Sequence, residues 1–208
     1  MVTSTIRGAE LSDLPYCYEI CVKTGDAGKD ASGLFYDPYV IGQYYAAPYL
    51  FFERDLCFVA ELNGIPQGYI IGVSDTHAFN GWLESDWLPP LQKRYRNYPL
   101  ENIKTDAERN AIALFYKNLN ASKKDEDSLY KTYPAHLHID LLPSLQGQGQ
   151  GRALLETLFA ALAKKNVHAV HLGVSGTNTS ALAFYRKMGF TPVKETDWGV
   201  IMGVHIKQ

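Results

Sequence analysis

Leu141-Leu142-Pro143-Ser144-Leu145-Gln146-Gly147-Gln148-Gly149-Gln150-Gly151-Arg152 joins a strand-like run to a leucine-rich helical pattern. Three glycines at alternate positions let the backbone turn with its N–H groups exposed, because no Cβ blocks close approach. The helix that begins there adds unsatisfied amides and a partial positive charge at the same point. Strand, loop and helix together predict a binding site for a phosphate group, whereas a glycine-rich hexapeptide alone is more often a flexible linker.

The composition predicts one globular domain over residues 1–208, because 208 residues with 46% hydrophobic content suffice for one sizeable core. The formal net charge of -2 supplies no basic field that would attract nucleic acids or anionic membranes. No run approaches the roughly 20 apolar residues that cross a bilayer, and the N-terminus lacks a signal-like segment. We therefore expect a cytoplasmic monomer or homodimer that binds neither nucleic acid nor membrane. The three cysteines are expected to be reduced core thiols.

The chain around the glycine-rich stretch alternates between strand and helix patterns. Asn63-Gly64 is a strong turn signal between two β-prone runs, Leu56–Leu62 and Gly68–Ser74, and predicts an antiparallel hairpin. The later pattern predicts, in chain order, strand His136–Leu142, helix Gly149–Lys165, strand Val167–Val174, helix Thr179–Met188, and strands Phe190–Val193 and Gly199–Ile206. A helix is also predicted over Tyr36–Ala47, with Pro48 limiting its extent.

Two segments fit the core less well. Residues 75–134 are too many for an ordinary connection and predict a helical insertion. Thr24–Gly33 is rich in glycine and charge, which indicates a loop. That loop carries two aspartates and a lysine beside aromatic residues, so it is either a substrate contact or a solvated connector.

The C-terminal third carries Gln146-x-x-Gly149-x-Gly151 and, one strand later, Asn178 and Ala181-x-x-Phe184-Tyr185-x-x-x-Gly189-Phe190. Together these motifs give a resemblance to the Gcn5-related N-acetyltransferase (GNAT) superfamily. It covers residues 136–206 closely and the first 75 residues more loosely. The implied fold is α/β (α+β): a mixed, mostly antiparallel, V-splayed sheet with helices on both faces and a helical insertion at about 75–134.

A narrower resemblance lies in three other stretches. Thr24–Gly28, Ala46–Tyr49 and His136–Pro143 are similar to bacterial relatives of the acetyltransferase-like domain attached to protein O-GlcNAcases. Because a fold does not determine an activity, this likeness leaves the chemistry open.

The superfamily resemblance implies acetyl-CoA as the cofactor. Its pyrophosphate would lie on amides of the glycine-rich loop, and its pantetheine arm would pair with exposed main-chain groups near Leu141 and Leu142. Asn178 would bind the cofactor, and Tyr185 would lie near its sulfur. The implied cofactor-binding residues are Leu141, Leu142, Gln146, Gly147, Gln148, Gly149, Gln150, Gly151, Arg152, Asn178 and Tyr185.

Acetyl transfer needs a group that takes the amine proton and a group that protonates the departing thiolate. Asp140 is the candidate base because it interrupts an apolar strand, where a carboxylate is costly unless it is paired or used. The alternative is a structural partner for nearby backbone or His138. Tyr185 is the candidate acid, and the alternative is a core tyrosine. Candidate acceptor-wall residues are Asp26, Asp30, Tyr36, Tyr44 and Trp82.

Other site chemistries fit poorly. His136 and Asp140 lie four positions apart on a strand, about 13 Å, which is too far for one metal ion, so no metal is expected. The glycine run lacks the Gly-Lys-Ser/Thr ending of a P-loop, and no serine lies in a nucleophile elbow. A dinucleotide-binding fold is not expected either, because it would place the glycine loop after an early strand of a parallel sheet. In this chain the predicted hairpin comes first.

The predicted function is that of an acetyl-CoA-dependent N-acetyltransferase. It would move acetyl to a primary amine of a small molecule or protein lysine, by direct attack in a ternary complex. The alternative is a catalytically silent module of the same fold that binds CoA, a peptide or a protein.

Overall fold

The computed structural model describes residues 4–99, 101, 103, 105–117, 119 and 123–206, with the backbone alone at 123–127. Across these residues one sheet holds seven strands in the order β1-β2-β3-β4-β5-β7-β6. The strands are β1 (Ser4–Gly8), β2 (Cys57–Leu62), β3 (Ile65–Val73), β4 (Ala135–Leu141), β5 (Ala169–Ser175), β6 (Thr191–Glu195) and β7 (Gly199–His205). Neighbouring strands are antiparallel except β4 and β5, which are parallel.

The sheet opens between its two central strands. β4 and β5 pair only at Ala135–Val170 and His136–His171, at the start of β4. Over its remaining residues β4 stays paired with β3, so its other edge diverges from β5. The mixed, mostly antiparallel, splayed sheet confirms the predicted fold class.

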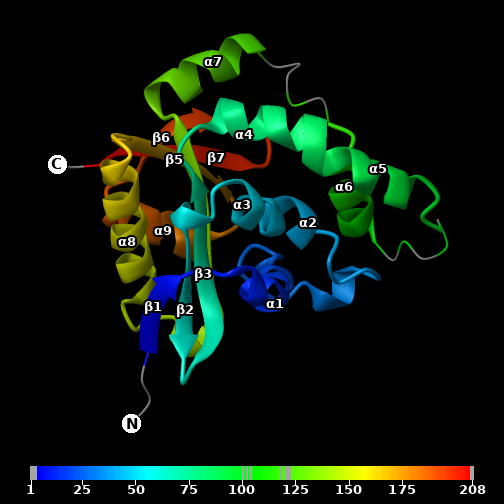
Figure 1. Ribbon diagram of the computed structural model, residues 1–208, viewed down its shortest axis with the longest axis horizontal. Helices are drawn as coiled ribbons and strands as arrows, with labels where there is room; N and C mark the ends of the chain where they lie inside the picture. The colour runs from blue at the N-terminus through cyan, green and yellow to red at the C-terminus, as the bar shows by residue number, and fades with distance from the viewer. Residues whose placement is uncertain are drawn as a thin grey trace.

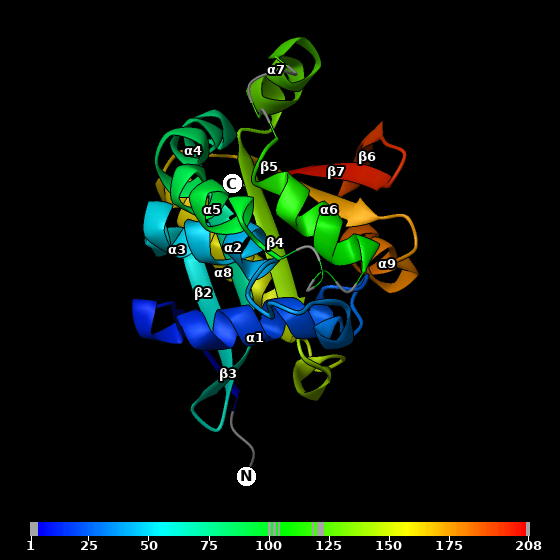
Figure 2. The same cartoon turned by 90° about the vertical axis from the view of Figure 1, so that its right-hand side faces the viewer.

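Helices cover both faces of the sheet (Figure 1). They are α1 (Leu14–Thr24), α2 (Gly42–Tyr45), α3 (Ala47–Phe52), α4 (Thr76–Trp82), α5 (Leu88–Arg96), α6 (Asp106–Leu114), α7 (Lys123–Thr132), α8 (Gln150–Lys164) and α9 (Thr179–Lys187). Figure 2 shows α1, α2 and α3 across the near face, with α8 behind the sheet. The helices between β3 and β4 run along one end of the molecule.

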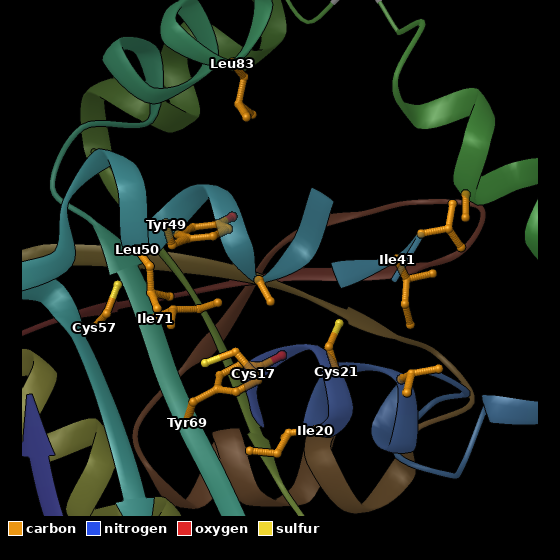
Figure 3. Packing of buried hydrophobic residues seen from close by; sticks show 14 of the residues in the cluster. Cys17, Ile20, Cys21, Ile41, Tyr49, Leu50, Cys57, Tyr69, Ile71 and Leu83 are labelled. Atoms are coloured by element: carbon orange, nitrogen blue, oxygen red, sulfur yellow. The ribbon is translucent and has the colours of Figure 1, made fainter. Parts of the chain in front are cut away.

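Alternation along the strands divides the buried residues into two cores. Tyr69, Ile71 and Val73 of β3 join the core under α1 to α3, whereas Ile70 joins the core under α8 and α9. Figure 3 shows Tyr69 and Ile71 projecting from β3 among side chains of α1 and α3. In the same way, side chains of β4 at 136, 138 and 140 face the first core, as their contacts with Tyr49 and Tyr69 show.

Local sequence signals explain the elements that the sequence predicts well. Asn63 and Gly64 have φ of 53° and 80°, the paired left-handed conformation of a two-residue hairpin turn. The leucine stripe of α8 is buried at Leu154, Leu155 and Leu158. These residues therefore set both the hairpin and the helix that follows the glycine-rich loop.

The prediction around Pro48 is wrong. α2 covers only Gly42–Tyr45, and Pro48 lies in the first turn of α3 instead of ending a helix. A proline is tolerated there because the first N–H groups of a helix have no intrahelical partner.

A buried carboxylate ties the helices between β3 and β4 to the chain after α1. Glu108 of α6 is 0% exposed and accepts hydrogen bonds from the N–H groups of Tyr36 and Asp37, at 2.9 and 3.1 Å. The Tyr98 hydroxyl donates to the same oxygen at 3.1 Å. The Asp37 carboxylate in turn accepts from the Tyr95 hydroxyl of α5. This network fixes residues 36 and 37 against α5 and α6.

Replacing Glu108 should destabilise the fold. Glu108→Ala leaves two backbone N–H groups and a phenol without their buried acceptor, so the free energy of unfolding should fall by about 2–4 kcal/mol. Urea denaturation measures this free energy of unfolding. Glu108→Gln keeps an acceptor oxygen and should lose less, and Glu156→Ala on the exposed face of α8 is the control. A Glu108→Ala protein as stable as the wild type would contradict this role.

Candidate functional site

A cleft of about 640 Å³ opens where β4 diverges from β5. Among the described residues, four segments line it: the end of α1 with the turn that follows, the end of β4, the glycine-rich loop with the start of α8, and α9 from the residues before it to its end. The glycine-rich loop, Asp140, Asn178 and Tyr185 therefore meet in one place, although Asp140 and Tyr185 are 45 positions apart in sequence.

The glycine-rich loop presents backbone amides to this cleft. Gly147 and Gly149 have φ of 72° and 81°, and a Cβ built at either would meet no atom within 4 Å. Within the described chain, no backbone acceptor is found for the N–H groups of residues 147–149, and the first N–H groups of α8 lack intrahelical partners. Gly151 is different, since its Cβ would lie 3.1 Å from the Phe184 ring. The loop thus combines free donors, a helix N-terminus and open space.

The end of β4 is more closed than the sequence predicts. Leu141 lines the cleft, but its carbonyl accepts a hydrogen bond from the Gln146 side chain at 2.7 Å. Leu142 does not line the cleft: its N–H donates to Gln67 O and its carbonyl accepts from Leu145 N. Gln148 and Gln150 also lie outside the lining. Their side-chain amides donate to Ser144 O and Ser4 Oγ, respectively.

Asn178 begins α9 and lies across from the turn after α1. Its Oδ1 accepts from Ala181 N at 3.1 Å, as an N-cap does. Its Nδ2 would lie 3.2 Å from a Cβ built at Gly28. The Asn178 side chain therefore both caps the helix and faces the opposite wall of the cleft.

Three cationic side chains line the cleft: Lys29, Arg152 and Lys187. Sequence reasoning selected Arg152 and missed the two lysines. Only their position in the fold brings them together, because they come from the turn after α1 and from the end of α9. All three are exposed, so they add positive charge near the amides of the glycine-rich loop.

Asp140 lies on the cleft side of β4, directly opposite Tyr69 of β3. The Tyr69 hydroxyl donates to Asp140 Oδ2 at 2.6 Å. Burial raises the pKa of the Asp140 carboxyl, and the hydrogen bond from the Tyr69 hydroxyl opposes that rise. A carboxylate with a raised pKa that still reaches a cleft is suited to take a proton.

Tyr185 lines the same cleft from α9 and is 8% exposed. Its burial, and to a smaller extent the negative charge of Asp140, raise the pKa of the phenol. At neutral pH the side chain therefore keeps its proton and can donate it.

The five predicted acceptor-wall residues do not line this cleft. Asp26 and Lys29 bond to each other through their backbones in a tight turn, and Asp30 accepts from Ser32 N. Tyr36 is 55% exposed beyond this turn. Tyr44 and Trp82 pack against the first core. The structure instead brings Thr24, at the end of α1, and Ala27, Gly28 and Lys29 of the loop that follows to the cleft.

The strand histidines have structural partners. His136 bonds to the Tyr49 hydroxyl at 2.8 Å and to the Thr76 hydroxyl at 2.9 Å. The His138 imidazole makes T-shaped ring contacts with Tyr45 and Tyr49. Among the described residues, no group of three His, Cys, Asp or Glu side chains is placed to hold a metal ion. None of the described helices has the length and apolar character needed to cross a membrane.

Comparison with known proteins gives a consistent result. The model of the acetyltransferase (GNAT) family matches residues 100–190. The ribosomal protein bS18-alanine N-acetyltransferase of Escherichia coli (strain K12) is 32% identical over 130 residues, which span 62% of this chain and 76% of that enzyme. The crystal structure of SsHAT matches with a TM-score of 0.86 and 34% identity, over 99% of this chain and 100% of that one.

A more distant structure shares only the fold. That of yncA from Salmonella typhimurium, solved with its cofactor acetyl-CoA, has a TM-score of 0.52 and 18% identity, over 99% of this chain and 95% of that one.

These comparisons confirm the predicted superfamily and the predicted enzyme class, an acyltransferase of the GNAT type with acetyl-CoA as the cosubstrate of such enzymes. The narrower resemblance to relatives of the O-GlcNAcase domain stays a prediction. Because the bS18-alanine acetyltransferase is 32% identical and 76% of its length is covered, the chain belongs to the acetyltransferase (GNAT) family.

Proposed function

We propose that this chain transfers an acetyl group from acetyl-CoA to a primary amine of a small molecule or a protein, by direct attack within a ternary complex. The observation that carries the proposal is the convergence in one cleft of a glycine-rich amide cradle, a carboxylate and a buried phenol. The similarity to the bS18-alanine N-acetyltransferase, an enzyme named for an amine acceptor, supports an acceptor of this kind.

The residues present fit acetyl-CoA. The left-handed glycines leave open space in front of free N–H groups, which suits a pyrophosphate at a helix N-terminus. Lys29, Arg152 and Lys187 add the charge that a polyanionic nucleotide requires. The widening gap between β4 and β5 leaves an unpaired strand edge for an extended arm. When bound, acetyl-CoA supplies an activated acetyl thioester.

The chain's own residues then handle two protons. Asp140 takes a proton from the acceptor amine, directly or through a water molecule, so that the nitrogen lone pair becomes available. Tyr185 donates its phenolic proton to the sulfur as the thiolate departs. The cleft also holds both reactants in one orientation, which supplies much of the rate gain in reactions of this kind.

The cradle has a direct test in Gly149. With φ of 81° it occupies a conformation that costs an L-residue about 1–2 kcal/mol. In Gly149→Ala the loop should leave the conformation that points its amides at the cleft, and the Kd for acetyl-CoA should rise about tenfold. Calorimetry measures it.

Gly81→Ala is the matched control, since a Cβ at Gly81 also meets open space but lies in α4, outside the cleft. Its Kd for acetyl-CoA should equal that of the wild type. Equal affinity in Gly149→Ala would remove the loop from the binding site.

The acceptor is tested by a thiol-release screen with acetyl-CoA over small amines, aminoglycosides, lysine peptides and peptides with free N-termini. Release of CoA with matching acetylation of one amine class, seen by mass spectrometry, is the expected result. Saturable acetyl-CoA binding without turnover on any of these amines would favour a silent binding module.

A further inference from the structure

The Asp140 carboxylate is held by a buried residue of the neighbouring strand. Tyr69 and Asp140 are directly opposed in the antiparallel pair of β3 and β4, so their side chains leave the same face of the sheet. The 2.6 Å bond engages Oδ2 of Asp140 and leaves Oδ1 outside this contact. Tyr69 itself is 0% exposed and does not line the cleft.

We infer that Tyr69 is a positioning residue for acetyl transfer: its hydroxyl orients the Asp140 carboxylate and stabilises the ionised form that accepts a proton. This inference rests on the proposed role of Asp140 as the base. Tyr69 acts through Asp140 and touches neither substrate.

The packing around Tyr69 keeps its hydroxyl protonated, so the hydroxyl acts as a hydrogen-bond donor. Its ring lies in the core beside Cys17 and Ile20 of α1 (Figure 3). This burial raises the pKa of the phenol well above its ordinary value, and the nearby Asp140 charge adds to the effect. The Thr24 hydroxyl also lies near Asp140, but it donates its single proton to Ile20 O at 2.8 Å. Tyr69 is therefore the donor on which the carboxylate depends.

The buried titratable groups packed around Tyr69 and Asp140 are neutral at pH 7. Burial raises the pKa of Cys21 of α1 and of Tyr185 of α9, so both stay neutral. On β4 itself, burial lowers the pKa of His138 to about 4, so its ring stays neutral as well. Cys17 of α1 is likewise kept neutral by burial. Lys29, which is exposed and lines the cleft, contributes a positive charge.

The test is the pH dependence of kcat/KM in Tyr69→Phe. The ring and its packing remain, and only the donor is lost. A carboxylate that loses a hydrogen bond is harder to ionise, so the acid limb of the profile should move to higher pH by about one to two units. Activity should fall most on the acid side of the profile and return toward the wild-type plateau as the pH rises. A merely structural loss would lower the whole profile without moving its limb.

Tyr95→Phe is the matched control. This change also removes a buried phenol that donates to a carboxylate, because the Tyr95 hydroxyl lies 2.5 Å from Asp37 Oδ2. Neither Tyr95 nor Asp37 lines the cleft. Its acid limb should coincide with that of the wild type. If Tyr69→Phe does not fold, 3-fluorotyrosine at position 69 replaces it: the stronger donor should move the limb to lower pH, and an unmoved limb overturns the inference.

Asp140→Asn, measured alongside, separates the two claims. If it is inactive while the Tyr69→Phe limb stays in place, the role of Tyr69 is refuted and that of Asp140 stands. If it keeps full activity, the base assignment fails, and the inference about Tyr69 fails with it.

Discussion

Asp140→Asn should lower acetyl-transfer turnover by about 10² to 10⁴-fold, the usual contribution of a positioned general base. The amide occupies the same space and can still accept the Tyr69 hydrogen bond, so the fold and the acetyl-CoA affinity should persist. What is lost is a group that can take the amine proton. Steady-state kinetics with the best amine, together with calorimetry of acetyl-CoA binding, measure both quantities.

The pH profile adds a second signature. Because the base acts in its ionised form, wild-type kcat/KM should rise with pH through the raised pKa of Asp140, and this limb should be absent in Asp140→Asn. Asp106→Asn on α6, where the side chain is 93% exposed, is the control and should behave as the wild type. Full turnover in Asp140→Asn across neutral pH would end the assignment.

Tyr185→Phe should lower turnover by about 10²-fold or more while leaving acetyl-CoA affinity nearly unchanged. Burial keeps the phenol protonated, so the wild-type side chain has a proton ready for the departing thiolate. Phenylalanine keeps the ring that packs against Phe190 and removes only that proton. Single-turnover rapid-quench kinetics isolate this step from product release.

The control for Tyr185 is Tyr116→Phe. Tyr116 is 49% exposed and its hydroxyl bonds to Gln92 O, away from the cleft. Its turnover should match that of the wild type. An unchanged single-turnover rate in Tyr185→Phe would leave Tyr185 as a core residue that merely borders the cleft.

The sequence predicts those parts of the fold that local conformation determines. Asn63-Gly64 has one favourable backbone conformation and thereby forms the hairpin. Gly149, with a left-handed φ, occupies the N-cap position before α8, and Asn178 caps α9. Each of these signals is contained within a few residues, so pattern and structure agree to within two residues at the ends of α8 and α9.

The parts that fail depend on strand register and on packing between distant segments. Tyr69 reads as one more apolar residue of a β-prone run, and only the pairing of β3 with β4 sets it against Asp140. Lys187 reads as a solvated helix end until α9 is placed beside the glycine-rich loop. The packing of Trp82 on Phe52 and Phe79 is likewise set by the fold and not by the local sequence.

The central claim is that the cleft between the glycine-rich loop and α9 holds acetyl-CoA for acetyl transfer. Calorimetric titration of the wild-type chain with acetyl-CoA, alongside Gly149→Ala, tests it most directly. The account predicts a saturable heat with one site per chain and an affinity about tenfold weaker in the variant. No binding heat at millimolar acetyl-CoA, or the same affinity in both proteins, would contradict it.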